Sequence, residues 1–247
     1  MTLFLALAML AANPVHCPSG ASDAECRAAD VAAAIDLAPD RLATLHSVCL
    51  YDYGGRCWVE ASGRIRGAEQ GGEIVWQKLR LAPKDGPAGW MDILVSLDGG
   101  TPRLVGYAES SGSIGSPDLV ATSDDQSLIH LTGTLAGSGG GNADALFAAD
   151  GAEARWRKID IESWWDDADA MLPKGYSLRG PADYIFSEMF ASIPVARDGD
   201  GHCCPRGGTA FFDLDIQGDR LIATHMRFQP MQPQGDEVDS EAAGRNR

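Results

Sequence analysis

The side chains with the most reactive chemistry in this chain are His202, Cys203 and Cys204, inside the sequence Asp198-Gly-Asp-Gly-His-Cys-Cys-Pro-Arg-Gly-Gly208. An imidazole beside two thiolates offers the soft ligands that zinc and copper prefer. A disulfide between adjacent cysteines would be strained and easily reduced, which would make the loop a redox switch. In the third interpretation, both cysteines are structural cross-links that pin a glycine-rich loop to a sheet.

The number and spacing of the cysteines favour the structural interpretation. The chain has six, an even number that is typical of a disulfide framework in an oxidising compartment. Cys49 and Cys57 flank a turn-rich stretch that can place them opposite each other across a hairpin, and Cys17 and Cys26 are similarly close in sequence. Each short loop closed in this way would stabilise the fold by roughly 2–3 kcal/mol in the chain-entropy model. The disulfide candidates are Cys17, Cys26, Cys49, Cys57, Cys203 and Cys204.

Motifs for metals, nucleotides and hydrolytic catalysis are incomplete in this chain. In a calcium loop that starts at Asp198, Cys203 takes the place of the required glycine and Thr209 that of the bidentate glutamate. The glycine-rich stretch 137–142 ends in Asn142, where a dinucleotide-binding loop needs glycine. The sequence contains no serine nucleophile elbow and no His-Glu-x-x-His helix. We therefore predict no metal, no cofactor and no catalytic residue.

A second group of residues offers a ligand site. Asp166 and Asp167 supply carboxylates for acid–base chemistry or cation binding, and Trp164 and Trp165 beside them could stack on a sugar ring. His202 is a further candidate for this ligand site. The alternative is a short helix whose tryptophans anchor it to a sheet while its carboxylates face water, and we favour this alternative.

Residues 208–228 predict a β-hairpin in a definite register. Apolar and polar residues alternate in both halves, and matching the apolar faces places Phe212 opposite Met226. The same register places Asp213 opposite His225 on the other face, as a cross-strand ion pair worth at most about 1 kcal/mol. A three-residue loop, 218–220, then joins the two strands.

The N-terminus has the pattern of an export signal. Residues 1–12 are an apolar run of signal-peptide length that ends in small residues and is followed by Asn13 and Pro14. No lysine or arginine precedes the run, so a misassigned start or a short buried helix is the alternative. A spanning helix needs about 20 apolar residues, and no stretch comes close to that length. We expect a periplasmic or secreted protein without a stable membrane span.

The charge balance excludes one class of partner. The chain has 20 basic and 35 acidic side chains, a formal charge of −15. A field of this sign repels phosphate backbones and anionic membrane surfaces, so nucleic acid is not an expected partner. The partner is therefore unknown at this stage; a cell-envelope protein and a small ligand are both open. The acidic surface can also serve only to keep the protein soluble.

Turn signals divide the chain from Cys49 onward into short apolar segments. Asp-Gly and Gly-Gly pairs recur between stretches rich in aliphatic and β-branched residues, the pattern of an antiparallel meander. Expected helices are 23–35 with a capping box of Ser22 and Glu25, 40–45, 163–172 capped by Ser163, and 181–192. The predicted strands are 57–66, 73–82, 90–97, 103–109, 127–135, 143–149, 153–161, 208–217 and 221–228.

These elements predict a mainly β fold of the β-rich α+β class. We expect an antiparallel meander sheet, or a sandwich or partly open barrel, with a few peripheral helices. The expected organisation is a signal peptide (1–12), an N-terminal helical segment (13–47), a main β-rich domain (48–228) and a flexible polar tail (229–247). The 247 residues, 45% of them apolar, can build one core of ordinary size.

Several short sequences in the second half of the chain carry a resemblance to a known family. They are Asn142-Ala-Asp, Asp150-Gly, Trp156, Ser163-Trp, Leu172-Pro-Lys-Gly and, above all, the stretch 198–208 around Cys203-Cys204-Pro205. Residues from about 133 to 228, some two-fifths of the chain, resemble a group of exported bacterial proteins without an established activity. The resemblance implies export and a high strand content.

Two hypotheses about function follow, from different classes. The first is a periplasmic or secreted binding or structural module without catalytic activity. The alternative is a hydrolase, or a thiol- or metal-dependent enzyme, with a site near Cys203 and Cys204. We favour the binding or structural module, because no nucleophile and base can be placed together from the sequence.

Overall fold

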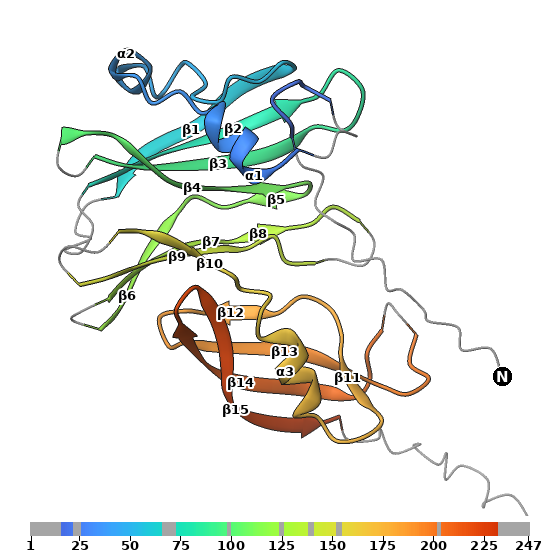
Figure 1. The fold of residues 1–247 in the computed structure, drawn as a ribbon. Coiled ribbons are helices and arrows are strands. Elements are labelled where there is room, and N and C mark those ends of the chain that lie inside the picture. Colours follow the sequence, from blue (N-terminus) through green and yellow to red (C-terminus); the bar gives the residue numbers. More distant parts are fainter. Residues whose placement is uncertain are drawn as a thin grey trace, which may run out of the picture.

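Short antiparallel strands dominate the computed structural model, which confirms the expected β-rich fold with a few short helices (Figure 1). The structure describes residues 16–21, 26–65, 73–97, 100–123, 126–137, 141–151, 155–201 and 204–231. The helices are α1 (Ala28–Ala33), α2 (Pro39–Ala43) and α3 (Trp165–Ala170). The strands are β1 (Arg56–Ile65), β2 (Ile74–Ala82), β3 (Gly89–Ser96), β4 (Arg103–Ser110), β5 (Ser113–Ile114), β6 (Asp118–Ser123), β7 (Gln126–Leu131), β8 (Gly133–Thr134), β9 (Ala145–Asp150), β10 (Arg157–Ile159), β11 (Tyr176–Leu178), β12 (Asp183–Ile185), β13 (Phe190–Arg197), β14 (Gly208–Gln217) and β15 (Arg220–Pro230).

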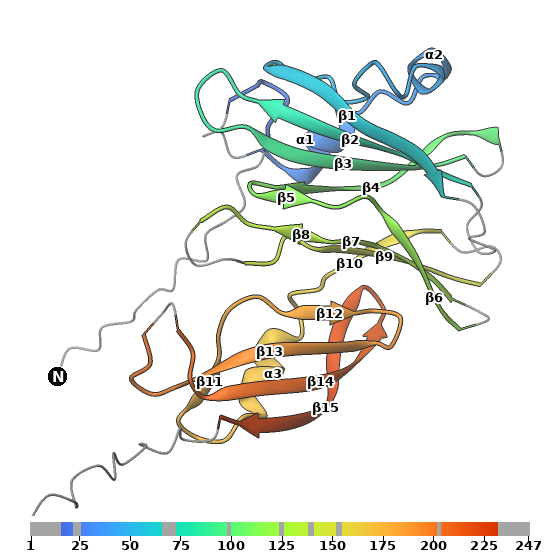
Figure 2. The same cartoon turned by 180° about the vertical axis from the view of Figure 1, so that it is seen from behind.

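Three sheets are stacked face to face, as Figure 1 and the reverse view in Figure 2 show. Sheet 1 has the strand order β1-β2-β3-β4, sheet 2 the order β10-β9-β7-β6, and sheet 3 the order β11-β13-β14-β15 with β12 also beside β13. Strands β5 and β8 form a small separate ladder. Sheet 2 is the middle layer, and α1 packs on the face of sheet 1 that is turned away from it.

The apolar core consists of three layers between these elements. Sheet 2 has a core on each side, because alternate residues of β9 pack in opposite directions. Leu146 and Ala148 pack towards sheet 3, whereas Phe147 and Ala149 pack towards sheet 1. Successive side chains of a strand point to opposite faces, so β9 must be apolar at every position to be buried on both. Its sequence, Ala-Leu-Phe-Ala-Ala followed by Asp150, meets that requirement.

The β14–β15 hairpin confirms the predicted pairs but not the predicted loop. Phe212 pairs with Met226 and Asp213 with His225, as expected. The loop is shorter than the predicted 218–220, because Gln217 already pairs with Arg220. Asp213 pairs with His225 and Leu214 with Ala223, so Thr224 between them forms a bulge. The bulge shifts the register by one residue, which is why the predicted pairs form although the loop is shorter than predicted. No ion pair joins Asp213 and His225 in this described part of the chain.

The expected helix over 181–192 is wrong, because this segment forms β12 and the start of β13. Asp183–Ile185 pairs antiparallel with Phe190–Ser192. The chain reverses between them at Met189, whose φ of 48° is incompatible with a continuous helix. Short apolar runs do not distinguish helix from strand by periodicity alone. The hairpin is more stable than a helix here, because it buries Phe186 and Ala191 in the core that sheet 3 shares with sheet 2.

The other helices are shorter than expected. The helix expected over 23–35 is α1, of six residues, at whose start the Asp30 carboxylate accepts from the amide of Arg27 at 3.1 Å. Ser22 and Glu25 lie outside the described residues. Ser163 does not cap α3, because its hydroxyl lies between the carbonyl oxygens of Asp160 (2.6 Å) and Leu221 (2.8 Å), to either of which its single proton can be donated. No helix within the described residues is long and apolar enough to cross a membrane.

Candidate functional site

Two of the predicted cysteine pairs are disulfides. Cys17 is joined to Cys26 and Cys49 to Cys57, with Cα–Cα distances of 5.7 and 6.5 Å. The first disulfide closes the segment before α1, and the second ties the segment after α2 to the start of β1. Cys204 is exposed, and Cys203 lies outside the described residues. The role of the Cys203-Cys204 pair stays a prediction.

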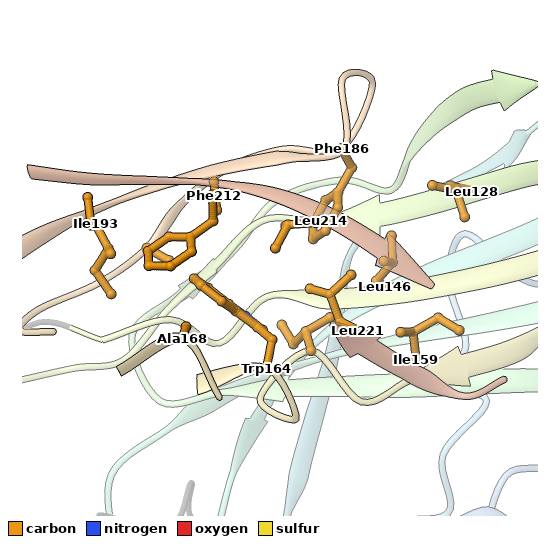
Figure 3. Packing of buried hydrophobic residues seen from close by; sticks show 14 of the residues in the cluster. Leu128, Leu146, Ile159, Trp164, Ala168, Phe186, Ile193, Phe212, Leu214 and Leu221 are labelled. Carbon is orange, nitrogen blue, oxygen red and sulfur yellow. The ribbon is translucent and has the colours of Figure 1, made fainter. Parts of the chain in front are cut away.

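The tryptophans of the predicted ligand site are divided between core and surface. Trp164 is completely buried, and its ring packs edge-on against Phe212 at 5.0 Å between centroids (Figure 3). Its Nε1 donates to the Tyr184 hydroxyl at 3.1 Å. No face of Trp164 is open to a sugar, so this residue anchors α3, as the alternative interpretation expected. Trp165 is partly buried, and Asp167 is exposed.

Two further residues, Asp166 and His202, were predicted for that site. Asp166 lies on α3, and His202 lies outside the described residues. The loop that leads to His202 is held at its neck by Asp200, whose Oδ2 accepts from the amides of Arg197 and Arg206, both at 2.8 Å. These two hydrogen bonds hold the pKa of Asp200 below its ordinary value. The Asp200 carboxylate therefore closes the neck of the loop by bridging Arg197 and Arg206.

A cleft of about 450 Å³ lies between α2 and the helix-covered face of sheet 1. This volume is within the range of about 300–1,000 Å³ typical of small-ligand sites. Val75 on β2 is buried at its floor, and the partly buried Leu97 follows β3. The lining residues are Pro39, Leu42, Ala43, Leu45 and His46 from α2 and the segment after it, Ser62, Gly63 and Arg64 from β1, and Val75 and Leu97.

A buried glutamine positions the wall of this cleft. Gln77 on β2 has no exposed surface, and its side-chain oxygen accepts from the amide of Leu50 at 2.7 Å. Its amide nitrogen donates to the carbonyl oxygens of Val48, at 2.8 Å, and Leu45. A buried amide is tolerated only when its donors and acceptors are satisfied. These bonds therefore fix residues 45–50 on the sheet and hold the wall at a set distance from the floor.

A disulfide and an ion pair also hold the wall. The Cys49–Cys57 disulfide joins the same segment, residues 45–50, to the start of β1. Asp36 accepts from the amide of Ala38 at 2.9 Å, next to α2, and forms an ion pair with Arg41 inside α2 at 3.2 Å. The wall is anchored at both ends, so the cleft is preformed, which limits the entropy that ordering would cost on binding.

The rim of the cleft carries two basic side chains. Arg64 is 54% exposed, and its Nη1 donates to Oε1 of Glu73 at 2.9 Å. A guanidinium has five donors, and the other nitrogens of Arg64 make no hydrogen bond within the described residues. His46 is exposed on the opposite wall. An apolar floor with free guanidinium donors at its rim is suited to an apolar ligand with one acidic group.

A partly buried ion pair and a buried carboxyl outside the cleft were missed from the sequence. His130 on β7 faces Asp144, with 2.7 Å between Nε2 and Oδ1, and the rings of His130 and Phe186 pack edge-on at 4.7 Å between centroids. Near this pair, burial raises the pKa of Tyr184 to about 12. A single polar residue inside an apolar strand indicates in the sequence that a buried polar group exists. It does not indicate which polar residues contact each other in the fold.

Asp92 on β3 is the buried carboxyl. It has no exposed surface, and neither carboxyl oxygen has a hydrogen-bond partner in the described part of the chain. Burial raises its pKa to about 7, against the opposing attraction of the Lys78 ammonium. Lys78 is its cross-strand neighbour on β2 and donates to the carbonyl oxygen of Ile114 at 2.6 Å. This carboxyl lies in a closed layer between sheets 1 and 2, not in the cleft.

Sequence reasoning did not find the cleft, because its walls are far apart along the chain. Leu42, Arg64 and Leu97 belong to three different segments, each of which has an ordinary pattern on its own. The only local signal is Pro39 at the start of a short helix, which marks the wall but not what faces it. In comparisons with known proteins, the chain matches no family model, no curated protein sequence and no solved structure.

Proposed function

We propose that this protein is an exported binding module without catalytic activity, and that its ligand occupies the cleft between α2 and β1. The observation that carries the proposal is the preformed cleft of about 450 Å³, with an apolar floor and Arg64 at its rim. The ligand has an apolar body that replaces water over Val75 and Leu97, and one acidic group that reaches Arg64.

The lining chemistry supports binding rather than catalysis. Of the ten lining residues, His46 is the one ordinary general-base candidate and Ser62 the one hydroxyl, and no carboxylate is among the ten to orient the histidine. Most of the lining consists of proline, leucine, alanine and valine side chains, which contribute area and shape. Binding sites are lined in this way, with a few polar groups that fix orientation.

The disulfides support the proposed location. Cysteine pairs persist as cross-links in the periplasm and outside the cell, whereas cytosolic thiols are kept reduced. One of the two, Cys49–Cys57, ties the segment that follows the lining residues Leu45 and His46 to the start of β1. An oxidising compartment preserves this cross-link, in line with the signal peptide expected over 1–12.

Titration with 1-anilinonaphthalene-8-sulfonate tests the proposal, because this dye combines an apolar ring system with one anionic group. We expect saturable binding with a stoichiometry of one and an increase in dye fluorescence. Ala43→Trp places an indole in the cleft and should weaken binding at least tenfold. Ala33→Trp is the matched control, an exposed alanine on α1 outside the cleft, and should bind as the unmodified protein does.

Near-ultraviolet circular dichroism of each variant separates loss of the site from loss of the fold. Equal dye affinity for Ala43→Trp, Ala33→Trp and the unmodified protein would show that the dye binds elsewhere. Absence of binding by the folded, unmodified protein would equally contradict the proposed function.

A further inference from the structure

One side of β1 has no neighbouring strand. β1 is the first strand in the order of sheet 1 and pairs only with β2 among the described residues. Every second residue of such a strand directs its N–H and C=O away from the sheet. No backbone hydrogen bond in the described part of the chain uses the outer side of residues 61–65. This edge can therefore accept one more strand.

The two halves of the β1 edge differ. The register shifts between Val59 and Ala61, so Glu60 forms a bulge. Before the bulge, Arg56 and Trp58 are exposed and contact each other, with the Arg56 guanidinium 5.4 Å from the Trp58 ring centroid. A bulge interrupts the regular row of backbone groups that strand addition needs. After the bulge, Ala61–Ile65 pairs regularly with β2, so this half of the edge presents regularly spaced backbone groups to a partner.

The open half of the edge is also the half that lines the cleft. Ser62 and Arg64 are two residues apart, so their side chains lie on the same face of β1, the face of Val75. A strand added beside them would place a side chain directly across from Arg64, with about 5 Å between Cβ atoms. The side chain two residues away would lie opposite Ser62, facing Leu42 and Leu45 across the cleft.

Charge complementarity decides what these two side chains are. A carboxylate across from Arg64 can accept from the guanidinium nitrogens that Glu73 does not occupy. The position that faces Leu42 and Leu45 favours an apolar side chain, because these two lining residues are apolar. The net charge of −15 repels a strongly acidic partner, so a single acidic residue is preferred over an acidic run.

The geometry points to an extended polypeptide segment as the ligand: it adds a strand to β1 at Ala61–Ile65, with one acidic residue opposite Arg64 and one apolar residue two positions away in the cleft. This inference rests on the proposed function of the cleft and specifies its ligand class. Backbone hydrogen bonds to the edge supply much of the affinity, and the two side chains supply the specificity, as in other cases of strand addition.

Peptides of equal composition test the spacing directly. The probes are fluorescein-labelled Thr-Thr-Glu-Thr-Leu-Thr-Thr amide and its reverse order, Thr-Thr-Leu-Thr-Glu-Thr-Thr amide, measured by fluorescence anisotropy. The isomer Thr-Thr-Thr-Glu-Leu-Thr-Thr amide is the control, because adjacent residues of a strand point to opposite faces. We expect one of the two spaced peptides to bind at least tenfold more tightly than the isomer; which one binds identifies the direction of the added strand.

Two further comparisons test the contacts. N-methylation of alternate residues of the bound peptide should abolish binding for one set and spare the other, because only one set directs its N–H groups at β1. Arg64→Gln should weaken binding of the glutamate peptide at least fivefold, but not that of its glutamine analogue. Arg56→Gln is the matched control on the same strand, beyond the bulge, and should change neither affinity.

The outcomes separate the inference from the function on which it rests. If the dye binds the cleft but all three peptides bind equally, or none binds, the strand-addition inference is wrong and the binding cleft remains. If neither dye nor peptide binds, both proposals fail. Pairing of β1 with β1 of a second copy, seen as a dimer by analytical ultracentrifugation and abolished by Ala61→Pro, would show that the edge serves self-association and would overturn the inference.

Discussion

His130 and Asp144 form a buried contact at the junction of sheets 2 and 3: His130 Nε2 lies 2.7 Å from Asp144 Oδ1, and the two side chains are 13% and 3% exposed. The other Asp144 oxygen accepts from Asn142 Nδ2 at 2.8 Å. Asn142 in turn binds the backbone of Ala182 twice, accepting from its amide at 2.6 Å and donating to its carbonyl oxygen at 2.8 Å. This network joins the segment before β9 to the segment before β12.

Asn142→Ala should destabilise the protein by about 2 kcal/mol, because it leaves the N–H and C=O of Ala182 without their partner. Urea unfolding followed by circular dichroism measures the change. Ser113→Ala is the control, since it removes a hydroxyl–hydroxyl contact to Thr134 at the surface and should cost less than about 0.5 kcal/mol. Equal effects of the two substitutions would show that the network does not couple the sheets.

Asp92 should make the protein less stable as the pH rises. The folded-state pKa of about 7 lies above the ordinary value of 3.8 for an aspartate, so the folded state holds a proton that the unfolded state releases. The stabilisation is complete below about pH 4 and is lost as the pH approaches 7, by up to about 4 kcal/mol. Asp92→Asn cannot titrate, so its free energy of unfolding should lack this decline. If the free energies of unfolding of the unmodified protein and of Asp92→Asn change in parallel with pH, Asp92 is not the group that causes the decline.

Lys78→Met offers an independent check on the same carboxyl. The Lys78 ammonium lowers the pKa of Asp92 by attraction, in opposition to burial. Its removal should therefore raise that pKa further and move the pH-dependent loss of stability to higher pH. A shift to lower pH would mean that the two side chains do not interact as the structure shows.

The two disulfides should contribute equally to stability but differently to binding. They close loops of similar sequence separation, nine and eight residues, so each pairwise Cys→Ser replacement should cost about 2.5 kcal/mol in the chain-entropy model. Only the pair Cys49→Ser and Cys57→Ser loosens the wall of the cleft, and it should also weaken dye binding. Dye affinity that falls equally with the pair Cys17→Ser and Cys26→Ser would indicate a general loss of structure instead.

Trp164→Ala should be far more destabilising than Trp165→Ala. Trp164 is completely buried against Phe212 and Tyr184, and removal of such a ring costs about 3–5 kcal/mol. Trp165 is only partly buried, so its loss should cost less than half as much. Thermal unfolding of both variants is the measurement. Comparable transition temperatures would contradict the structural role of Trp164 and favour the interpretation of the two tryptophans as a ligand-binding site.

The sequence was most informative where the deciding interactions are local. The cysteine pairs Cys17–Cys26 and Cys49–Cys57, and the pairing of Phe212 with Met226, followed from short spacing and from alternation. The helix expected over 181–192 failed, because an amphipathic run of that length also fits a hairpin that packs on sheet 2. The hairpin loop failed for a related reason, since a bulge at Thr224 leaves no sequence signal.

The sequence by itself determined the β-rich class and which residues are apolar on both faces, as in β9, because alternation is a property of each strand alone. Only the tertiary structure decided that Leu42, Arg64 and Leu97 face one cleft, that Gln77 holds its wall, and that Asp92 has no partner. These relationships join residues on separate segments. They depend on how the sheets stack and on which edge of β1 stays open, and neither is encoded in any single stretch of the chain.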